Sequence, residues 1–507
     1  MWFTVGLIVV FSLFIRLYSC LWLKPRATRT KLSKQGIKGP KPAFLLGNVV
    51  EMRRIQSKLP KSEVKDGQVF HDWASKSLFP FFSLWTQKYG NTFVVSLGNI
   101  QVLYVSDHDL VKEINQNTSL DLGKPKYLQK ERGPLLGQGI LTSNGPLWAY
   151  QRKIMTPELY KEKIKGMCEL MVESAAWLVE KWETRIQGDG GVADIRIDED
   201  LRSFSGDVIS KACFGSSYAG GREIFLRLRA LQQQIASKAL LMGFPGLKYL
   251  PIKSNREIWR LEKEIFQLIM KLVTDREKGQ HERDLLQIII EGAKSSDLSS
   301  EAIANFIVDN CKNVYLAGHE TTAMSAGWTL LLLANHPEWQ ACVRNEILLV
   351  TEGRDPDFDM LHKMKLLTMV IQEALRLYPT VIFMSREALE DMKIGNIQVP
   401  KGVNMWIPVV TLQRDTTVWG EDANEFNPER FANGVNNSCK VPQLYLPFGA
   451  GPRICPGINL AMTEIKILLC ILLTKFSFSV SPNYRHSPVF KLVLEPENGI
   501  NVIMKKL

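Results

Sequence analysis

The sequence predicts a fold that is mainly α with small β-sheets, and three observations support this. Apolar residues recur at three- and four-residue spacing in long segments, as in amphipathic helices. Runs that alternate like strands are short, which favours small sheets beside a helical mass. The chain is 45% hydrophobic and 23% charged, which excludes a disordered protein, a collagen and a coiled-coil rod. The predicted helices span 148–186, 224–238, 256–278, 283–293, 299–335, 338–351, 361–377 and 457–474, and the predicted strands span 92–97, 101–105, 393–394, 403–408 and 500–504.

Charge and cysteine content narrow the class of protein further. Lys and Arg outnumber Asp and Glu by 63 to 52, and the net charge of +11 over 507 residues is too dilute to argue for a nucleic-acid partner. The eight cysteines include no Cys-x-x-Cys pair, so a disulfide scaffold is excluded and a zinc site is not expected. No repeat and no long polar linker divides residues 46–507, and we therefore expect one large domain there.

Residues 1–23 form a candidate transmembrane anchor. Trp2 to Leu23 is mostly apolar and reaches roughly 33 Å as a helix, enough to cross a bilayer core of about 30 Å. Its one charged residue, Arg16, has a side chain long enough to reach the interface. A cleaved signal peptide is disfavoured, because no basic residue precedes the apolar run and no Ala-x-Ala site follows it. A buried core helix is the remaining alternative.

Residues 24–45 form a basic linker that ends in the stiff segment Gly39 to Pro42. Its seven positive charges, with no acidic residue among them, are Lys24, Arg26, Arg29, Lys31, Lys34, Lys38 and Lys41. Positive flanks stay on the cytosolic side of a membrane. We therefore expect a single pass, with the N-terminus in the lumen and the domain that follows in the cytosol.

The longest predicted helix begins near Ser299, a suitable N-cap, and ends before Pro337. It would reach roughly 54 Å and cross the whole domain. Its middle, Ala317 to Thr322, places small and polar residues where a buried helix needs bulk. Because Gly costs about 1 kcal/mol against Ala in a helix interior, this stretch indicates a need for space, and its Thr hydroxyls favour a bend.

The segment Phe448 to Gly457 is the strongest chemical signal. Its Gly and Pro residues predict a tight, rigid turn, and a helical pattern starts right after Cys455. Amides at a helix N-terminus lower the pKa of a thiol, which favours Cys455 as a thiolate ligand of a metal. Taken alone, an inert buried cysteine is the alternative.

Five of these residues, Phe448, Gly451, Arg453, Cys455 and Gly457, resemble the haem-binding loop of the cytochrome P450 haem-thiolate monooxygenases. The other marks of that family occur in the same order, so the resemblance covers essentially the whole chain. It implies the cytochrome P450 fold, with haem b between the long distal helix and the Cys loop. It also implies that Cys455 is the axial ligand of the iron and favours O–O cleavage.

Two further motifs resemble those that hold the haem in the family. Trp148 and Arg152, four apart at the start of a helix, resemble the pair that meets a haem propionate, although Trp148 could instead be a core aromatic. Arg386 and Arg453 resemble two more propionate contacts, a role that suits the planar guanidinium.

Glu373 and Arg376, three apart on a helix, would by themselves be a surface ion pair. In the family they join an Arg of the Phe426 to Phe431 segment. The resemblance therefore implies a structural triad of Glu373, Arg376 and Arg430 that locks the Cys loop.

The middle of the long helix resembles the oxygen-activation motif of the family. Ala317 and Gly318 are expected to open room for dioxygen over the haem. The expected catalytic residues are Glu320 and Thr321, as an acid–alcohol pair that steers protons, and Thr322, which helps to shape the kink. For His319 we expect a packing role, with iron ligation as the alternative.

Substrate specificity is expected from the family's variable segments Lys124–Ile140, Leu240–Tyr249 and Thr380–Met384. The last is apolar and should line the pocket, whereas Leu240 to Gly246 either dips into the membrane or is a plain buried loop. The first carries cations that would meet an acidic substrate or face the membrane: Lys124, Lys126, Lys130 and Arg132.

The resemblance implies a monomeric monooxygenase of the endoplasmic reticulum membrane that uses O2 and NADPH-derived electrons. No Gly-x-Gly-x-x-Gly follows a strand, so a separate NADPH-cytochrome reductase is expected as partner. Its predicted docking face is basic: Arg152, Lys153, Lys161, Lys163, Lys165 and Lys440. Segments 35–40, 47–48 and 51–57 resemble plant membrane-bound members that oxidise gibberellins and related terpenoids. A triterpenoid or other hormone oxidase, a haem-thiolate isomerase or dehydratase, and a haem electron carrier are the alternatives.

Overall fold

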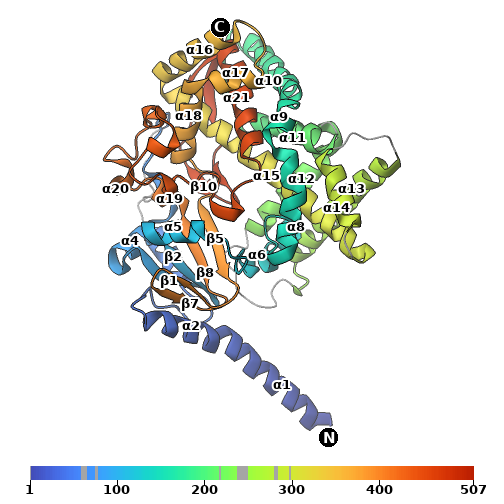
Figure 1. Ribbon diagram of the computed structural model, residues 1–507, viewed down its shortest axis with the longest axis vertical. Helices are drawn as coiled ribbons and strands as arrows, with labels where there is room; N and C mark the ends of the chain where they lie inside the picture. Colours follow the sequence, from blue (N-terminus) through green and yellow to red (C-terminus); the bar gives the residue numbers. More distant parts are fainter. Residues whose placement is uncertain are drawn as a thin grey trace.

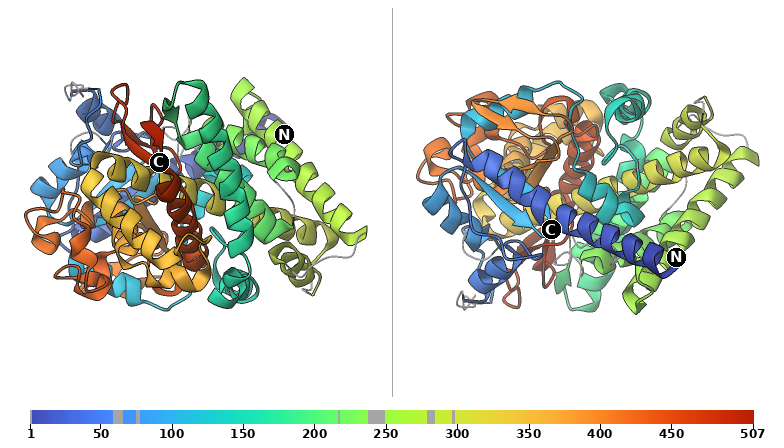
Figure 2. Two further views of the ribbon diagram at one scale, coloured as in Figure 1. Left: turned by 90° about the horizontal axis from the view of Figure 1, so that it is seen from above. Right: turned by 90° about the horizontal axis from the view of Figure 1, so that it is seen from below.

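A helical region and a sheet region lie side by side, and an N-terminal helix projects from the sheet region (Figure 1). The computed structural model describes residues 2–58, 66–74, 78–215, 218–236, 249–278, 284–295 and 298–507. In Figure 2, the light-blue strands and the green helices lie on opposite sides of the body. Large apolar side chains such as Phe204 and Trp328 fill the helical core, and Phe93 and Tyr104 stack in the core of the sheet region. The fold is therefore mainly α with small β-sheets, as predicted.

The main sheet has five strands in the order β1-β2-β8-β5-β3. Strand β2 pairs with β8 in parallel, and the other neighbours are antiparallel. The strands of this sheet are β1 (Thr92–Leu97), β2 (Ile100–Val105), β8 (Asn404–Pro408), β5 (Phe383–Ala388) and β3 (Leu122–Gly123). The smaller sheets contain β4 (Val192–Arg196), β12 (Asn501–Lys506) and β9 (Phe476–Val480), then β10 (Pro488–Phe490) with β11 (Leu494–Pro496), and β6 (Met392–Ile394) with β7 (Ile397–Val399).

The helices surround α15, the long central helix (Figure 1). Near the sheets lie α3 (Val49–Lys58), α4 (Pro80–Tyr89), α5 (His108–Gln116), α6 (Lys126–Glu131), α7 (Gly133–Leu136), α19 (Val409–Leu412) and α20 (Thr416–Trp419). The others are α8 (Gly145–Met155), α9 (Lys161–Lys165), α10 (Cys168–Gly188), α11 (Asp198–Phe214), α12 (Tyr218–Ala236), α13 (Lys253–Lys278), α14 (Leu285–Lys294), α15 (Ser300–Asn335), α16 (Pro337–Thr351), α17 (Phe358–Lys363), α18 (Lys365–Leu377) and α21 (Ile458–Lys475).

Most of the predicted elements agree with these bounds, and α15 agrees closely. The side chain of Ser299 caps its first turn by accepting a hydrogen bond from the amide of Ala302. Helix 148–186 was expected as one element, but the structure divides it into α8, a 3₁₀ turn, α9 and α10. The interruption is local: Pro157 cannot donate to a helical hydrogen bond, and Tyr160 is extended.

The N-terminus is helical well beyond the expected anchor. Helix α1 (Trp2–Tyr18) continues through the π-turn Ser19–Leu23 into α2 (Lys24–Ser33). Within the described residues, Trp2–Ser33 is the one helix long and apolar enough to cross a membrane. The basic segment expected as a linker is thus partly helical, and it is docked: Leu32 is fully buried and Arg29 donates to carbonyls of β1 and of Pro40.

Candidate functional site: the Cys loop and the distal helix

The loop from Phe448 to Gly457 is a rigid turn that presents Cys455. Gly449 and Gly451 have φ values of +71° and +69°, which favour glycine, and a Cβ at Gly451 would overlap the backbone of α5. The amide of Cys455 donates to the carbonyl of Phe448 at 2.9 Å, which closes the turn. Gly457 then caps α21, so the thiol lies just before a helix N-terminus, as the sequence predicted.

The environment of the Cys455 thiol has two opposing effects. Burial raises its pKa, whereas the amide of Gly457 and the positive charge of Arg152 lower it, and burial dominates. The expected lowering by the helix terminus is therefore outweighed in the protein alone. A bound iron would supply the missing positive charge, because metal coordination deprotonates a thiol.

Three cations, Lys124, Arg386 and Arg453, lie near one another beside this loop, and we call them the cation cluster. The guanidinium of Arg453 stacks on the ring of Trp148 at 4.2 Å, and its Nη2 donates to Asn144 Oδ1 at 2.8 Å. Its Nη1 is buried and has no hydrogen-bond partner in the described part of the chain. A small pocket opens here, lined by Trp148, Arg386 and Arg453 among others.

The cation cluster lacks compensating negative charge. Among the described residues, no carboxylate forms an ion pair with any of the three side chains. Burial is the main cause that lowers the pKa of each: to about 10 for Arg386, to about 9 for Arg453 and well below the ordinary value for Lys124. Each cation is therefore costly where it stands unless an anion binds.

This donor set fits the haem that the resemblance implies. A haem carries two carboxylates, and the cation cluster offers charge and an unpaired guanidinium N–H to receive them. Cys455, beside a helix N-terminus, would ligate the iron. Trp148 would pack beside the carboxylates, since it already lies under the guanidinium of Arg453.

Arg152 contacts the Cys loop directly. It lies four residues after Trp148 on α8, and its Nη1 donates to the carbonyl of Ile454 at 2.6 Å. Its charge lowers the pKa of the adjacent Cys455. Arg152 therefore braces the Cys loop and favours the thiolate.

The middle of α15 carries the expected hydroxyl. The Thr321 hydroxyl donates to the carbonyl of Ala317, and Ser325 and Thr329 repeat the pattern at 2.9 and 2.7 Å. Such bonds to the preceding turn favour a bend, as expected from the sequence. Ala317 and Thr321 are partly exposed on a mostly buried helix and share one face, whereas Thr322 is buried.

Gly318 allows close helix packing. A Cβ there would overlap the side chain of Ile209 on α11, and its carbonyl accepts a hydrogen bond from Ser205 at 3.0 Å. The glycine therefore lets α11 approach the middle of α15.

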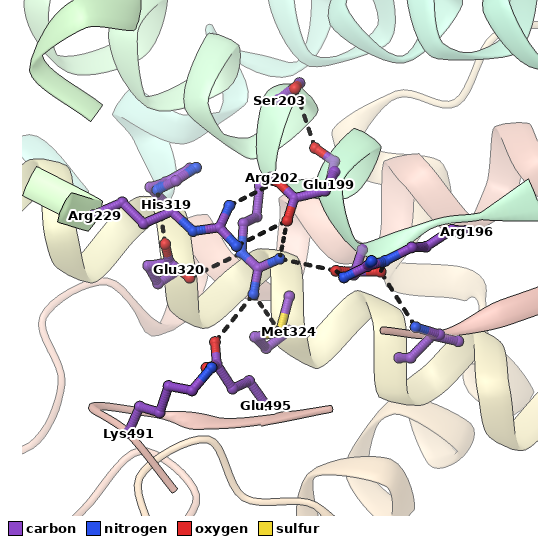
Figure 3. A network of polar contacts seen from close by, with 12 residues as sticks. Arg196, Glu199, Arg202, Ser203, Arg229, His319, Glu320, Met324, Lys491 and Glu495 are labelled. Carbon is purple, nitrogen blue, oxygen red and sulfur yellow. Dashed lines mark hydrogen bonds and ion pairs between the residues drawn. The ribbon is translucent and has the colours of Figure 1, made fainter. Parts of the chain in front are cut away.

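Glu320 lies in a buried network centred on Arg202 of α11 (Figure 3). Its Oε2 is 3.1 Å from Arg202 Nε, and the two side chains are 3% and 5% exposed. Arg202 also contacts the carboxylates of Asp198, Glu199 and Glu495 at 3.1, 3.3 and 3.2 Å. We call Arg202 and these four carboxylates the arginine hub.

The arginine hub holds Glu320 as an anion. Burial alone would raise the pKa of Glu320, but His319, Arg202 and Arg229 outweigh it and lower that pKa. His319 Nδ1 is 3.6 Å from Glu320, and its ring packs against Phe225. The carboxylate therefore faces α11, and reaching the Thr321 side of α15 requires release from Arg202.

The predicted triad is assembled. Arg376 Nε and Nη2 donate to Glu373 at 2.6 and 2.8 Å, both side chains are fully buried, and Arg430 lies 3.4 Å from Glu373. Arg376 also donates to the carbonyls of Gln413 and Ala423. The triad thus ties α18 to the chain leading to the Cys loop.

The expected specificity segments are only partly assembled. Of the apolar turn, Val381 is 43% exposed while Ile382 is in the core, so the side chains do not all face one pocket. Lys126 pairs with Glu387 at 3.7 Å, and Lys124 belongs to the cation cluster rather than to a pocket mouth. Of the predicted stretch 240–249, residues 240–248 lie outside the described part of the chain.

Sequence reasoning missed Arg202, and it missed that Lys124 lies beside Arg386 and Arg453. No local pattern marks them, since both lie far in the chain from their partners Glu320 and Arg453. A buried acid in α15 did imply some cation nearby, but the sequence offers many.

Known proteins resemble this sequence along nearly the whole chain. The family "Cytochrome P450" matches residues 67–504. Cytochrome P450 714C2 of Oryza sativa subsp. japonica is 51% identical over 511 residues, covering 99% of this chain and 97% of that protein. Cytochrome P450 714A2 of Arabidopsis thaliana is 44% identical over 503 residues, covering 97% and 95%. This chain therefore belongs to the cytochrome P450 family of monooxygenases and resembles its plant members.

Proposed function

We propose that this cytochrome P450 is a membrane-anchored monooxygenase that inserts one oxygen atom of O2 into a terpenoid such as a gibberellin. Electrons would come from NADPH through a separate NADPH-cytochrome reductase. The observation that carries the proposal is the pairing of Cys455, on its rigid loop, with a cation cluster of one buried and two half-buried side chains that has no carboxylate partner among the described residues.

Each residue of the site has a definite task in this proposal. Bound haem iron would supply the reductive activation of O2. Cys455 donates its thiolate, while Lys124, Arg386 and Arg453 hold the propionates beside Trp148. Phe448 and Gly457 fix the loop on either side of the thiol.

Proton delivery is assigned to Thr321. Its hydroxyl now donates to the carbonyl of Ala317, and rotation would turn it toward a ligand on the partly exposed face of α15. Glu320 is held as an anion by Arg202, so it acts as a proton relay only after release. Thr321→Ala should keep the haem but lower product formed per NADPH, since proton delivery contributes about 10²- to 10⁴-fold.

The primary experiment is spectroscopic and uses the full chain in microsomes. Reduced, CO-bound protein should show the Soret band of a thiolate-ligated haem, and product formation should require O2 and NADPH. A hydroperoxide isomerase would turn over without O2, and an electron carrier would give no product, so both alternatives are separated.

Membrane anchoring rests on the apolar N-terminal helix and on the basic segment that follows it. We place residues 1–23 in the endoplasmic reticulum membrane, residues 24–45 at its cytosolic surface, and the monomeric catalytic domain 46–507 in the cytosol. Part of the basic reductase face is already paired, since Lys163 contacts Glu158 and Lys165 contacts Asp359. Lys153, Lys161 and Lys440 are exposed and remain its candidates.

For the substrate we favour a rigid diterpenoid acid, with a triterpenoid acid as the second candidate. Arg132 is half-buried, and burial lowers its pKa, so an acidic ligand would be favoured there. A rigid polycycle also loses less entropy on binding than a flexible chain. Methyl-esterifying the acid should weaken binding, and Arg132→Met should remove the difference between acid and ester.

A further inference from the structure

Four polar residues of α15 hold the backbone of residues 134–141, which we call the wall segment. They are Asp309, Asn310, Lys312 and Asn313, and we call these four residues the clamp. Polar side chains of this kind are rarely buried without a partner. Here Asn310 and Asn313 are at most 1% exposed and Lys312 is 4% exposed, and all of them bind the same segment.

The two asparagines bind residues 136–141 of the wall segment. Asn313 accepts from the amide of Leu141 at 2.9 Å and donates to the carbonyl of Leu136 at 2.7 Å. Asn310 accepts from the amide of Ile140 at 3.0 Å. A side-chain amide can satisfy a backbone donor and a backbone acceptor at once, as a neighbouring strand would.

The two charged residues bind Gln138 and Pro134 of the same segment. Asp309 accepts from the amide of Gln138 at 2.8 Å, and Lys312 donates to the carbonyl of Pro134 at 3.2 Å. The two also pair with each other at 2.9 Å, so neither charge is buried alone. The clamp is therefore electrically neutral and leaves its own groups satisfied.

Two glycines allow this close approach. Gly137 has a φ of +54°, and a Cβ there would overlap the carboxylate of Asp309. A Cβ at Gly139 would lie 2.7 Å from the side chain of Asn313. At Gly137 and Gly139 the backbone of the wall segment thus packs directly against side chains of the clamp, and no larger residue fits at either position.

Asn310 lies on the face of α15 that carries Ala317 and Thr321. Asn310, Ala317 and Thr321 are separated by seven and four residues, which places them on one stripe of the helix. Asn313 is one turn, about 6 Å, before Ala317. Helix α7, at the start of the wall segment, also contacts α12 and α13, so this segment is enclosed by helices.

We propose that Asp309, Asn310, Lys312 and Asn313 are positioning residues that hold the wall segment as a preformed side of the substrate pocket. They determine specificity by fixing how far a ligand above the haem can extend toward α7. The wall does not have to be ordered when substrate binds, so ligands that reach it gain affinity from its rigidity. This inference rests on the proposed function for the haem and the substrate pocket, but the clamp itself does not.

The first arm of the test measures the wall directly in the full-length holoenzyme. Asn313→Ala leaves the Leu141 amide unpaired and leaves the Leu136 carbonyl only its 3.4 Å hydrogen bond from the amide of Gly139. Hydrogen exchange in a peptide covering 136–141 should accelerate about tenfold or more. Thr329→Ala removes a buried hydroxyl of the same helix that bonds only within it, and exchange in this peptide should not change. Unchanged protection in Asn313→Ala would overturn the clamp.

The second arm measures the pocket with two iron ligands, imidazole and the longer 1-phenylimidazole, each followed by the shift of the Soret band. In Asn313→Ala the affinity for 1-phenylimidazole should fall roughly fivefold, because the wall must now be ordered on binding. The affinity for imidazole should stay, since it does not reach the wall. Equal changes for both ligands, or none in spite of lost protection, would overturn the specificity role.

The two arms separate the possible failures. If the wild-type protein showed no thiolate-ligated haem, the proposed function would fail and the exchange arm would still test the clamp. Gly139→Ala provides an independent variant on the wall segment itself. Its added Cβ should push the wall segment away from Asn313 and reproduce both effects.

Discussion

The arginine hub and the cation cluster each contain a buried arginine, Arg202 and Arg386, yet they are opposite in composition. In the hub, Arg202 contacts four carboxylates from three different segments. In the cluster, Lys124, Arg386 and Arg453 face one another without a carboxylate partner among the described residues. The hub is complete within the chain, whereas the cluster requires an anion from outside it.

This difference indicates which buried charges are structural and which bind a ligand. Removing one partner from a neutralised buried group leaves the others unpaired and is strongly destabilising. Removing one charge from an uncompensated cluster relieves repulsion in the protein alone and weakens only the bound state. The Glu373–Arg376 pair, with both side chains fully buried, belongs with the hub.

The largest effect is expected at Cys455, the proposed iron ligand that lies beside the cation cluster. Cys455→Ser should abolish the thiolate spectrum and all activity, because a hydroxyl is far too weak an acid to serve as an anionic ligand near neutral pH. Cys439→Ser, a half-buried cysteine of the same region, should keep both. A thiolate-type Soret band in Cys455→Ser would remove the assignment of the whole site.

The arginine hub should then respond as a structural element. Arg202→Met leaves Glu320, Asp198 and Glu495 without their common partner, and it should cost about 3–5 kcal/mol in the free energy of unfolding. Urea unfolding followed by circular dichroism measures this loss. Arg229→Met breaks a more exposed pair with Glu199 and should cost less than about 1 kcal/mol. Equal losses in the two variants would contradict the hub.

The cation cluster should show the opposite behaviour. Lys124→Met removes a charge with no ion pair among the described residues, so unfolding of the haem-free protein should not become easier. Haem retention, measured by transfer to an acceptor apoglobin, should weaken roughly 10- to 100-fold, as for loss of a charge-assisted contact. Lys393→Met, at an exposed lysine, is the control. If Lys124→Met unfolded as easily as Arg202→Met, the proposed difference between the cation cluster and the arginine hub would be contradicted.

The smallest effect concerns pH. The pKa of Glu320 is lowered from 4.5 in the folded state. The unfolded chain therefore binds the proton first as pH falls, and the contribution of Glu320 to stability is present above pH 4.5 and lost below it. Thermal unfolding measured from just above pH 4.5 downward should show this slope, and Glu320→Gln should flatten it. An unchanged slope would place the acid sensitivity elsewhere.

Much of the fold and part of the site could be predicted, for local reasons. Ser299 and Pro337 mark the ends of α15, because a capping side chain and a missing amide act within a turn. The loop around Cys455 was recognisable because its tight turn needs positive φ values, and glycine is the residue that adopts them without strain. The break of the predicted helix 148–186 was missed, since its apolar periodicity continues past Pro157 while the backbone does not.

The sequence by itself determined the fold class, the apolar N-terminal helix, the Cys loop and the Thr321 hydroxyl proposed for proton delivery. Only the tertiary structure decided which charges meet. Glu320 turns to Arg202, 118 residues away, while Gly318 makes room for α11. Likewise Lys124 joins Arg453, and Asn313 binds the wall segment. The physical reason is range: caps, turns and periodicity act within a few residues, whereas the pairing of a buried charge depends on which distant segment the fold brings within about 4 Å.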